Sequence, residues 1–225
     1  MTADLSLPRP AGRVRRASLS SQVVEHIKNL VFDGTLKAGT RVPQDAIAAE
    51  LGVSRVPVRE ALITLEESGL VASEPHRGMF VLPIRAEDVE DHYRMYGMIQ
   101  ALAAVRAADR ITEPVLEKLE ELHVRMVAGQ EDPHPLNAEF HQLVNRTGGS
   151  KRVRAVLRHL SRNFSDEVFT VPPAADEQAC ADHKAIIAAL RCGDRPALDA
   201  VHQRHVRREG DAVVAELARR GVLAD

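Results

Sequence analysis

The chain has 225 residues, 28% of them charged and 44% hydrophobic, and its formal net charge is −2 at pH 7. This length can bury the core of one large or two modest domains. The near-neutral charge argues against a protein that coats nucleic acid through bulk positive charge, and no apolar run approaches the roughly 18 residues of a membrane-spanning helix.

The chain contains two cysteines, Cys180 and Cys192, which lie twelve residues apart. This spacing is not the CxxC pattern of metal and redox sites, so we expect both thiols to be incidental. Because the N-terminus does not resemble a signal peptide either, we expect a reducing, cytoplasmic location.

Residues 1–17 are rich in arginine and proline and poor in apolar side chains. We therefore expect a disordered basic tail, which either follows DNA phosphates or is simply solvated. From Leu19 to Val31, apolar residues recur every three or four positions. This spacing predicts an amphipathic helix that ends near Asp33.

Residues 44–69 show helical spacing of apolar residues on both sides of a break at Gly52. Glycine can adopt the positive φ that ends a helix, and the Ser54 hydroxyl can accept a bond from the free N–H groups that open the next one. Pro57 falls in the first turn of the second helix, where its missing N–H costs nothing. The pattern predicts two short helices joined by a tight turn.

The second of these helices carries Arg55 and Arg59 close to its N-terminus. A helix-turn-helix places that part of its second helix in the major groove of DNA. The alternative, from this segment alone, is a helical hairpin whose two arginines are solvated.

Two strand-like runs follow at 71–74 and 79–82, separated by a turn that contains His76, Arg77 and Gly78. The proline before His76 and the glycine favour a turn, so the two runs are predicted to pair as a hairpin. A hairpin directly after a recognition helix is a wing, and its tip can reach the minor groove or a phosphate.

Over residues 18–83 the sequence resembles the winged-helix DNA-binding domain of GntR-type bacterial transcription regulators, most specifically in the segments LGVSRVPVREAL and HRGMFV. The resemblance implies that Arg55 and Arg59 contact DNA. Some members add a basic residue near the start of the preceding helix, where this sequence has Asp45. The candidate DNA-binding residues are Ser54, Arg55, Pro57, Arg59, His76, Arg77 and Gly78.

After a short linker at 83–87, strand-like runs stop, and glycine and proline breaks separate helical patterns. The predicted helices span 86–110, 113–129, 134–147, 150–168, 175–192 and 195–220. Apolar stripes such as Leu116, Leu119, Leu122 and Met126 predict that they pack as a bundle. We therefore predict a mainly α fold, with a winged helix-turn-helix and its small β-hairpin wing at 18–83, and an all-α bundle of six to seven helices at 84–225.

Three histidines of the bundle are candidates for one site. Asn137 and His141 lie four residues apart on one helical face. His183 and His205 lie eleven residues before and after Asp194, in a predicted turn, so they should have similar heights on two antiparallel helices. Three neutral imidazoles and an amide oxygen suit a divalent ion such as Zn, Mn or Ni, although histidines that hold no metal are commoner.

Residues 86–220 resemble the all-helical FCD ligand-binding domain of the FadR-like branch of these regulators. In its metal-binding members the ligands come from a D/N-x-x-F-H motif and from one histidine in each of the last two helices. The resemblance implies Asn137, His141, His183 and His205 as ligands, with His202 in reserve for the last of them. Asparagine in place of the more usual aspartate removes a negative charge, so we expect weaker metal binding.

The small molecules that such domains bind are mostly organic acids, sugar acids or fatty acyl derivatives, and a carboxylate can take open positions on a metal ion. Many members carry an arginine on the first bundle helix, where this sequence has Tyr96, and Arg94 is close by. The resemblance therefore implies an effector site near Tyr96 and Arg94 for a carboxylate, although a less polar or larger effector also fits.

Three functions are open at this point. The first is a ligand-responsive regulator, expected to be a repressor, that binds a near-palindromic operator in double-stranded DNA as a homodimer. The second is a metal-dependent hydrolase, but its acidic candidates, Glu139 and Asp182, form no motif such as HExxH. The third is a DNA-binding protein whose metal is structural or is itself sensed.

Overall fold

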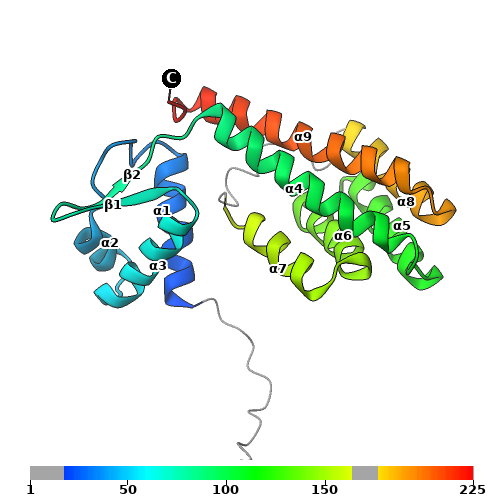
Figure 1. Ribbon diagram of the computed structural model, residues 1–225, viewed down its shortest axis with the longest axis horizontal. Helices are drawn as coiled ribbons and strands as arrows, with labels where there is room; N and C mark the ends of the chain where they lie inside the picture. The colour runs from blue at the N-terminus through cyan, green and yellow to red at the C-terminus, as the bar shows by residue number, and fades with distance from the viewer. Residues whose placement is uncertain (1–17, 164–176, 225) are drawn as a thin grey trace, which may run out of the picture.

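The computed structural model describes residues 18–163 and 177–224, so the expected basic tail lies outside the described residues. Along the chain the elements are α1 (Leu19–Phe32), α2 (Gln44–Glu50), α3 (Arg55–Glu67), β1 (Val71–Glu74), β2 (Gly78–Val81), α4 (Ala86–Ala107), α5 (Glu113–Ala128), α6 (Pro133–Gly148), α7 (Lys151–Leu160), α8 (Glu177–Cys192) and α9 (Arg195–Arg219). In Figure 1, α1 to α3 and the hairpin form one region, and α4 to α9 form a helical bundle beside it. This confirms the predicted fold class.

The helix-turn-helix forms around a tight turn at Gly52, whose φ is +63° as the sequence predicts. Pro57 is the third residue of α3, where a missing N–H leaves no intrahelical bond unmade. Ser54 precedes the helix in an extended conformation, but its hydroxyl makes no capping hydrogen bond, so the predicted cap is wrong. The exposed hydroxyl faces solvent, and the first N–H groups of α3 stay open to other partners.

A third segment, the connector before α2, pairs with the wing, and the sequence pattern does not reveal this pairing. Within the hairpin, Val71 pairs with Val81 in an antiparallel register. The connector before α2 then runs along β2, because Val42 N–H donates to Met79 O at 2.9 Å and Arg41 forms an isolated bridge with Phe80. The connector is therefore part of the wing.

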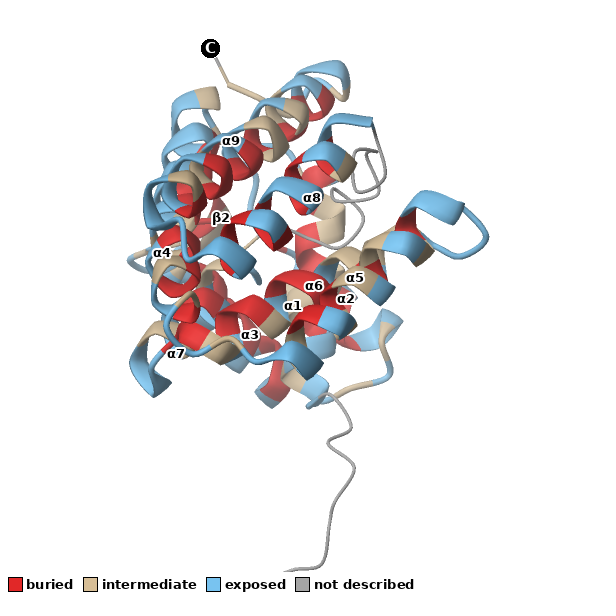
Figure 2. Cartoon of the chain, turned by 90° about the vertical axis from the view of Figure 1, so that its right-hand side faces the viewer, coloured by how far each residue is buried: buried red, intermediate tan, exposed pale blue. Residues whose placement is uncertain are grey.

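Helices α4 and α9 form the central pair of the bundle, and small residues let them approach closely. A Cβ added at Gly210 would lie 2.8 Å from the Cβ of Tyr93, and one added at Gly97 would lie 3.3 Å from the Cβ of Val206. The other helices pack around this pair, so that Figure 2 shows buried positions along the inner sides of the helices and exposed ones outside. No helix within 18–163 or 177–224 combines the length and hydropathy that crossing a bilayer requires.

Most predicted helix ends of the bundle fall within one turn of the observed ones. The exception is α7, which ends at Leu160 and not near 168. The chain tightens there, since Arg162 N–H donates to His159 O at 3.2 Å and Asn163 N–H donates to Leu160 O at 3.1 Å. The predicted start of α8 near 175 lies outside the described residues.

The winged region and the bundle share buried contacts. One apolar cluster runs from α1 to α3 into α4 and α9, where it includes Tyr93 and Val213. The segment after α9 adds polar contacts, because Ala224 N–H donates to Ile84 O at 2.8 Å and Arg220 Nη1 donates to Phe32 O at 3.4 Å. The end of α9 is thus attached to both the linker and α1.

Candidate functional site

The first turns of α3 present two arginines to solvent. The Arg55 side chain is 76% exposed, and its Nε lies 2.8 Å from Oδ1 of Asp45, which is also largely exposed. Arg59, one turn later, is exposed and makes no ion pair with any carboxylate that the structure describes. Both guanidinium groups therefore lie on an accessible face of the helix that is predicted to enter the major groove.

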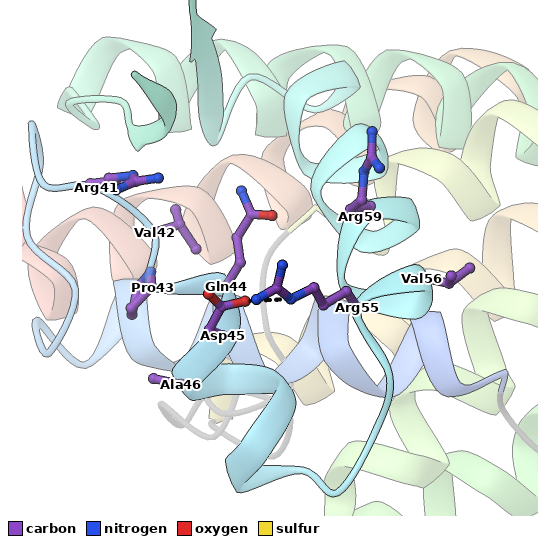
Figure 3. Close-up of a pocket in the computed structure, with 9 residues that line it drawn as sticks. All are labelled: Arg41, Val42, Pro43, Gln44, Asp45, Ala46, Arg55, Val56 and Arg59. Atoms are coloured by element: carbon purple, nitrogen blue, oxygen red, sulfur yellow. Dashed lines mark ion pairs between the residues drawn. The ribbon is translucent and has the colours of Figure 1, made fainter. Parts of the chain in front are cut away.

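A hollow of about 590 Å³ opens between the N-terminal ends of α2 and α3 (Figure 3). Its lining residues are Arg41, Val42, Pro43, Gln44, Asp45, Ala46, Arg55, Val56 and Arg59. Figure 3 shows Arg41 on the side opposite α3, so that its guanidinium and those of Arg55 and Arg59 surround one space. The sequence pattern does not indicate Arg41 as part of this surface, because its position depends on the pairing of the connector with the wing.

At the tip of the wing, His76 has a φ of +62° and lies exposed beside Arg77. Arg77 forms an ion pair with Glu74, and its guanidinium carbon lies 5.0 Å from the centre of the Phe80 ring. Gly78 has a φ of +105°, and a Cβ there would lie 3.0 Å from Nε of Arg41. The tip thus offers His76 directly, whereas Arg77 is folded back on the wing.

The two remaining DNA-binding candidates differ in exposure. Pro57 is buried in the core of the winged region, so it can shape the start of α3 but offers little surface to a ligand. Ser54 is exposed next to Arg55, and its hydroxyl is not engaged in a helix cap.

A second cluster lies inside the bundle, where α6, α8 and α9 bring together His141, His183 and His205. All three are buried, and their ligand atoms lie within 4.8 Å of one another. Nε2 of His141 is 3.2 Å from Nε2 of His205 and 3.4 Å from Nε2 of His183. The predicted facing of His183 and His205 is thus observed, with ring centres 5.1 Å apart.

The chemistry of this donor set fits a divalent metal ion. Zinc binds imidazole nitrogen at roughly 2.0–2.1 Å, which places the nitrogens of a tetrahedral site roughly 3.3 Å apart. The two distances from Nε2 of His141, 3.2 and 3.4 Å, match this spacing. Behind the cluster, Nδ1 of His205 donates to the buried carboxylate of Asp182 at 3.3 Å. That bond fixes the tautomer and aims the Nε2 lone pair at the other two rings. Arg204, at 2.7 Å, and Arg208 hold Asp182 in turn.

Burial keeps two of the three imidazoles in the neutral form that binds metal. Burial and the neighbouring His205 lower the pKa of His141 well below its usual value, and the same causes lower the pKa of His183 to about 3. For His205 burial acts in the same direction, but the hydrogen bonds to Asp182 and Glu209 outweigh it and raise the pKa to about 9. A metal ion would compete with that proton for Nε2.

Asn137 and His202, the other two proposed ligands, behave differently. Asn137 lies one turn before His141, and its Oδ1 is buried without a hydrogen-bond partner among the described residues. His202 donates from Nδ1–H to Leu198 O, 2.9 Å away, and its ring centre is 6.2 Å from that of His141. The arrangement therefore favours His205 over His202 as the ligand from α9, with Asn137 as an available oxygen donor.

The two candidate effector-binding residues differ in exposure and in their contacts. Arg94 is 65% exposed and forms a 2.8 Å ion pair with Asp91 on the surface, so it does not face the buried histidines. Tyr96 is partly buried; burial and the nearby Glu209 raise its pKa to about 12, and it hydrogen-bonds with Gln100. The sequence analysis missed Gln100, whose buried Oε1 has no hydrogen-bond partner within the described ranges.

The carboxylates around the cluster do not provide a hydrolytic base. Asp182 is committed to His205 and two arginines, and Glu139 is exposed near Lys118 at 4.0 Å. Glu209, which sequence reasoning also missed, lies 3.4 Å from Nε2 of His205, four residues away on the same helix. This contact engages Glu209 with His205, so it is not a free base.

Comparisons with known proteins agree with this geometry. Residues 19–81 match the gntR family of bacterial regulatory proteins, and residues 91–208 match the FCD domain. An uncharacterised HTH-type transcriptional regulator of Mycobacterium tuberculosis is 32% identical, over 90% of this chain and 84% of the relative. The HTH-type transcriptional repressor RspR of Escherichia coli is 26% identical, over 87% of this chain and 89% of the relative.

Solved structures show the same fold. McbR/YncC of E. coli superposes with a TM-score of 0.63 at 20% identity, over 89% of this chain and 98% of that one. A putative GntR regulator from Rhodococcus has a TM-score of 0.57 at 25% identity, over 88% of this chain and 99% of that one. These relatives are transcription regulators and not enzymes. The chain therefore belongs to the GntR family of bacterial transcription regulators and carries an FCD domain behind its DNA-binding helix-turn-helix.

Proposed function

We propose that this regulator is a metal-containing, ligand-responsive repressor that acts in the cytoplasm and binds a near-palindromic operator as a homodimer. The observation that carries the proposal is the pairing of two sites in one chain. One is an accessible recognition helix with Arg55 and Arg59, and the other is the buried triad of His141, His183 and His205. The E. coli relative named as a repressor supports the direction of control.

On DNA, α3 would lie in the major groove with its first turns against the base edges. Arginine reads guanine through two hydrogen bonds, so Arg55 and Arg59 are the expected base-reading residues. Arg41 and His76 flank them and are expected to contact phosphates or the minor groove. We assign this activity to residues 18–83 and effector binding to residues 84–225.

An apolar face of α4 supports the homodimer. Met95, Met98 and Leu102 recur at helical spacing and are 52%, 53% and 39% exposed. A symmetric pair needs the same patch on both partners, and a single face on the helix next to the linker meets that condition. The expected two-fold axis then matches the symmetry of a palindromic operator.

In the bundle, His141, His183 and His205 would hold the ion, with Asn137 as a further oxygen donor. A bound divalent ion supplies positive charge and open positions for an anionic group, which suits an organic acid. The neutral polar side chains of Tyr96 and Gln100 are expected to contact the rest of the effector. Effector binding regulates DNA binding only if it favours one arrangement of the two domains over the other.

The proposal is tested by selecting an operator from a random-sequence DNA library with the purified chain and measuring gel retardation. We expect a near-palindromic consensus, and we expect a screen of carboxylic acids to yield one that weakens retardation. If no duplex is retarded at low salt, the DNA-binding proposal is wrong.

Metal removal separates the roles of the ion. Chelation followed by dialysis should lower the thermal midpoint and also abolish the response to the acid. A lower midpoint with unchanged operator affinity and response would make the ion structural, whereas changed affinity without any acid would make the ion the sensed species.

A further inference from the structure

We infer that the outer face of α7 is a second, sequence-independent DNA contact, which binds the phosphate backbone of duplex DNA next to the operator. This inference rests on the proposed function, because it extends the surface that meets DNA from the winged domain to the bundle. We call this surface the α7 basic face and define it by Lys151, Arg152, Arg154, Arg158 and Arg162.

The sequence concentrates positive charge here. Between Glu139 and Asp166 the chain has no acidic residue, yet it has six lysines and arginines, although the whole protein has a net charge of −2. A cluster of one sign within a near-neutral chain creates a local potential that the overall charge does not reveal. The expected partner is therefore a polyanion.

The positive charges are not neutralised within the described structure. Lys151, Arg152, Arg158 and Arg162 are exposed, and none of them forms an ion pair with a carboxylate in 18–163 or 177–224. Most other arginines of the bundle do pair, as Arg195 does with Asp109. Among the described residues, the cations of α7 are therefore open to an external anion.

The helix arranges these charges along one line. Lys151, Arg154 and Arg158 follow one another at intervals of three and four residues, which places them on one face of α7, and Arg162 lies in the turn that follows. At 1.5 Å per residue the helical part of this row, from Lys151 to Arg158, is about 10 Å long, which equals about three steps of one DNA strand along the duplex axis. A row of this length suits a regularly charged backbone better than a single small anion.

The opposite face of α7 excludes a membrane as the partner. Val153, Leu157 and Leu160 lie on that side, and α7 packs against α4. Leu157 is only 5% exposed and the other two are partly buried, which leaves Val156, 40% exposed, as the one exposed large apolar side chain of α7. A single valine offers little apolar surface for insertion into lipid. Attraction through charge alone remains, and duplex DNA is the polyanion that this protein already meets.

The location of α7 brings the basic face close to the DNA-binding region. Nζ of Lys28 on α1 donates to the carbonyl of Arg162 at 2.7 Å, which attaches the end of α7 to the winged region. Figures 1 and 2 place the first turn of α7 and the helices α1 and α3 together on the lower side of the molecule. We therefore expect a duplex that extends past α3 on this side to reach α7.

Salt dependence tests the inference in the full-length protein. The α7 variant is Lys151→Gln/Arg158→Gln, and the matched control is Arg106→Gln/Arg191→Gln, which removes the same charge from the C-terminal ends of α4 and α8. These ends lie on the far side of the bundle from the winged region (Figure 1). All four residues are exposed, so both variants should fold, and their thermal midpoints check this.

Affinity is measured from about 50 to about 200 mM salt on a duplex of about 40 base pairs that contains the selected operator, and on one of the same length and arbitrary sequence. Each lost phosphate contact lowers the slope of log K against log salt by about 0.9, so the α7 variant should lose about 1.8 per protomer on both duplexes. The control should keep the wild-type slope. On an operator duplex trimmed to about 20 base pairs, the difference should shrink.

Equal slopes for the α7 variant and the control overturn the inference, whether both are unchanged or both fall. Normal DNA binding by the α7 variant together with lost binding to polyglutamate overturns it too, because the face would then serve an acidic protein. If wild type selects no operator while the α7 variant still loses slope on the arbitrary duplex, the proposed function fails but the α7 contact stands.

Discussion

The recognition surface and the histidine centre both contain an acid paired with a base, but in opposite surroundings. The Arg55–Asp45 pair is more than two-thirds exposed on each side, whereas the side chains of His205 and Asp182 are 3% and 1% exposed. An exposed pair contributes at most about 1 kcal/mol and exchanges partners easily. Breaking a buried pair costs more free energy, because the remaining charge is left buried without a partner. The surface is suited to exchange Asp45 for DNA, and the interior is suited to keep its geometry.

The largest effect is expected when a buried candidate metal ligand is removed. We expect His183→Ala to reduce metal content from about one ion per chain to none. It should also lose about 4 kcal/mol of metal-linked stability when free ion exceeds Kd a thousandfold. Elemental analysis and thermal denaturation with and without added zinc measure both. His134→Ala, on the same helix as His141 but outside the cluster, is the control and should keep the ion.

If the His183→Ala protein retained its ion with unchanged stability, the triad would not be the metal site. Retention by His202→Ala together with loss by His205→Ala would further identify which histidine of α9 is the ligand.

Acid sensitivity should depend on buried histidines and not on exposed ones. Burial, and then the positive charge of His159, lower the pKa of His92 from 6.5 to about 4. Because the unfolded chain takes up this proton first, the free energy of unfolding should fall as pH drops from 6.5 to 4, by about 3 kcal/mol for this group. His92→Phe keeps an aromatic ring and should flatten that part of the pH profile, measured by denaturant titration at several pH values.

The control for the pH experiment is His134→Phe, at a partly exposed histidine, which should follow the wild-type profile. Parallel profiles for wild type and His92→Phe would show that burial at this position does not govern the acid response.

At the surface, Arg59→Ala should weaken specific operator binding by about 2 kcal/mol if its guanidinium reads a guanine. Stability should change little, because the side chain is exposed. Fluorescence anisotropy on the selected operator and on a duplex with that base pair exchanged measures the loss. Arg106→Ala, an exposed arginine at the end of α4, is the control. If the wild-type protein bound both duplexes equally well, Arg59 would not read that base pair.

The smallest effect is expected for the exposed ion pair itself. Asp45→Asn should change the free energy of unfolding by about 0.5 kcal/mol or less. It should strengthen binding to arbitrary DNA, because a negative charge leaves a surface that faces phosphates. Asp109→Asn breaks a similarly exposed pair with Arg195 in the bundle and should leave DNA binding unchanged. Weaker binding by the Asp45 variant would mean that Asp45 positions Arg55 for its base.

Much of the winged region could be predicted because its signals are local. Gly52 has the expected positive φ, and Pro57 lies in the first turn of α3, as turn and helix chemistry require. The prediction of a capping bond from Ser54 was wrong, because a side-chain cap is one of several ways to satisfy the N–H groups at the start of a helix. Arg41 was missed because it joins the surface through a bridge to Phe80, a contact that local pattern does not encode.

The histidine triad was predictable for a different reason. Helix length and a short turn fix the relative heights of His183 and His205, and these two residues do meet. The surrounding polar groups were harder to foresee. Glu209 reaches His205, and Gln100 reaches Tyr96, through the rotation of α9 and α4 about their axes. That rotation depends on close contacts such as that of Gly210 with Tyr93. Rotation is a property of packing, and spacing alone does not determine it.

Helix α9 carries His205 near its middle and runs without interruption to Arg219, just before the residues that bond to Ile84 and Phe32. The distance from His205 to the last turn is about 21 Å at 1.5 Å per residue. A tilt of roughly 5° about the histidine therefore displaces the far end by roughly 2 Å. Because α9 is continuous, a tilt too small to separate the three histidines would still shift the residues that join α9 to the linker and to α1.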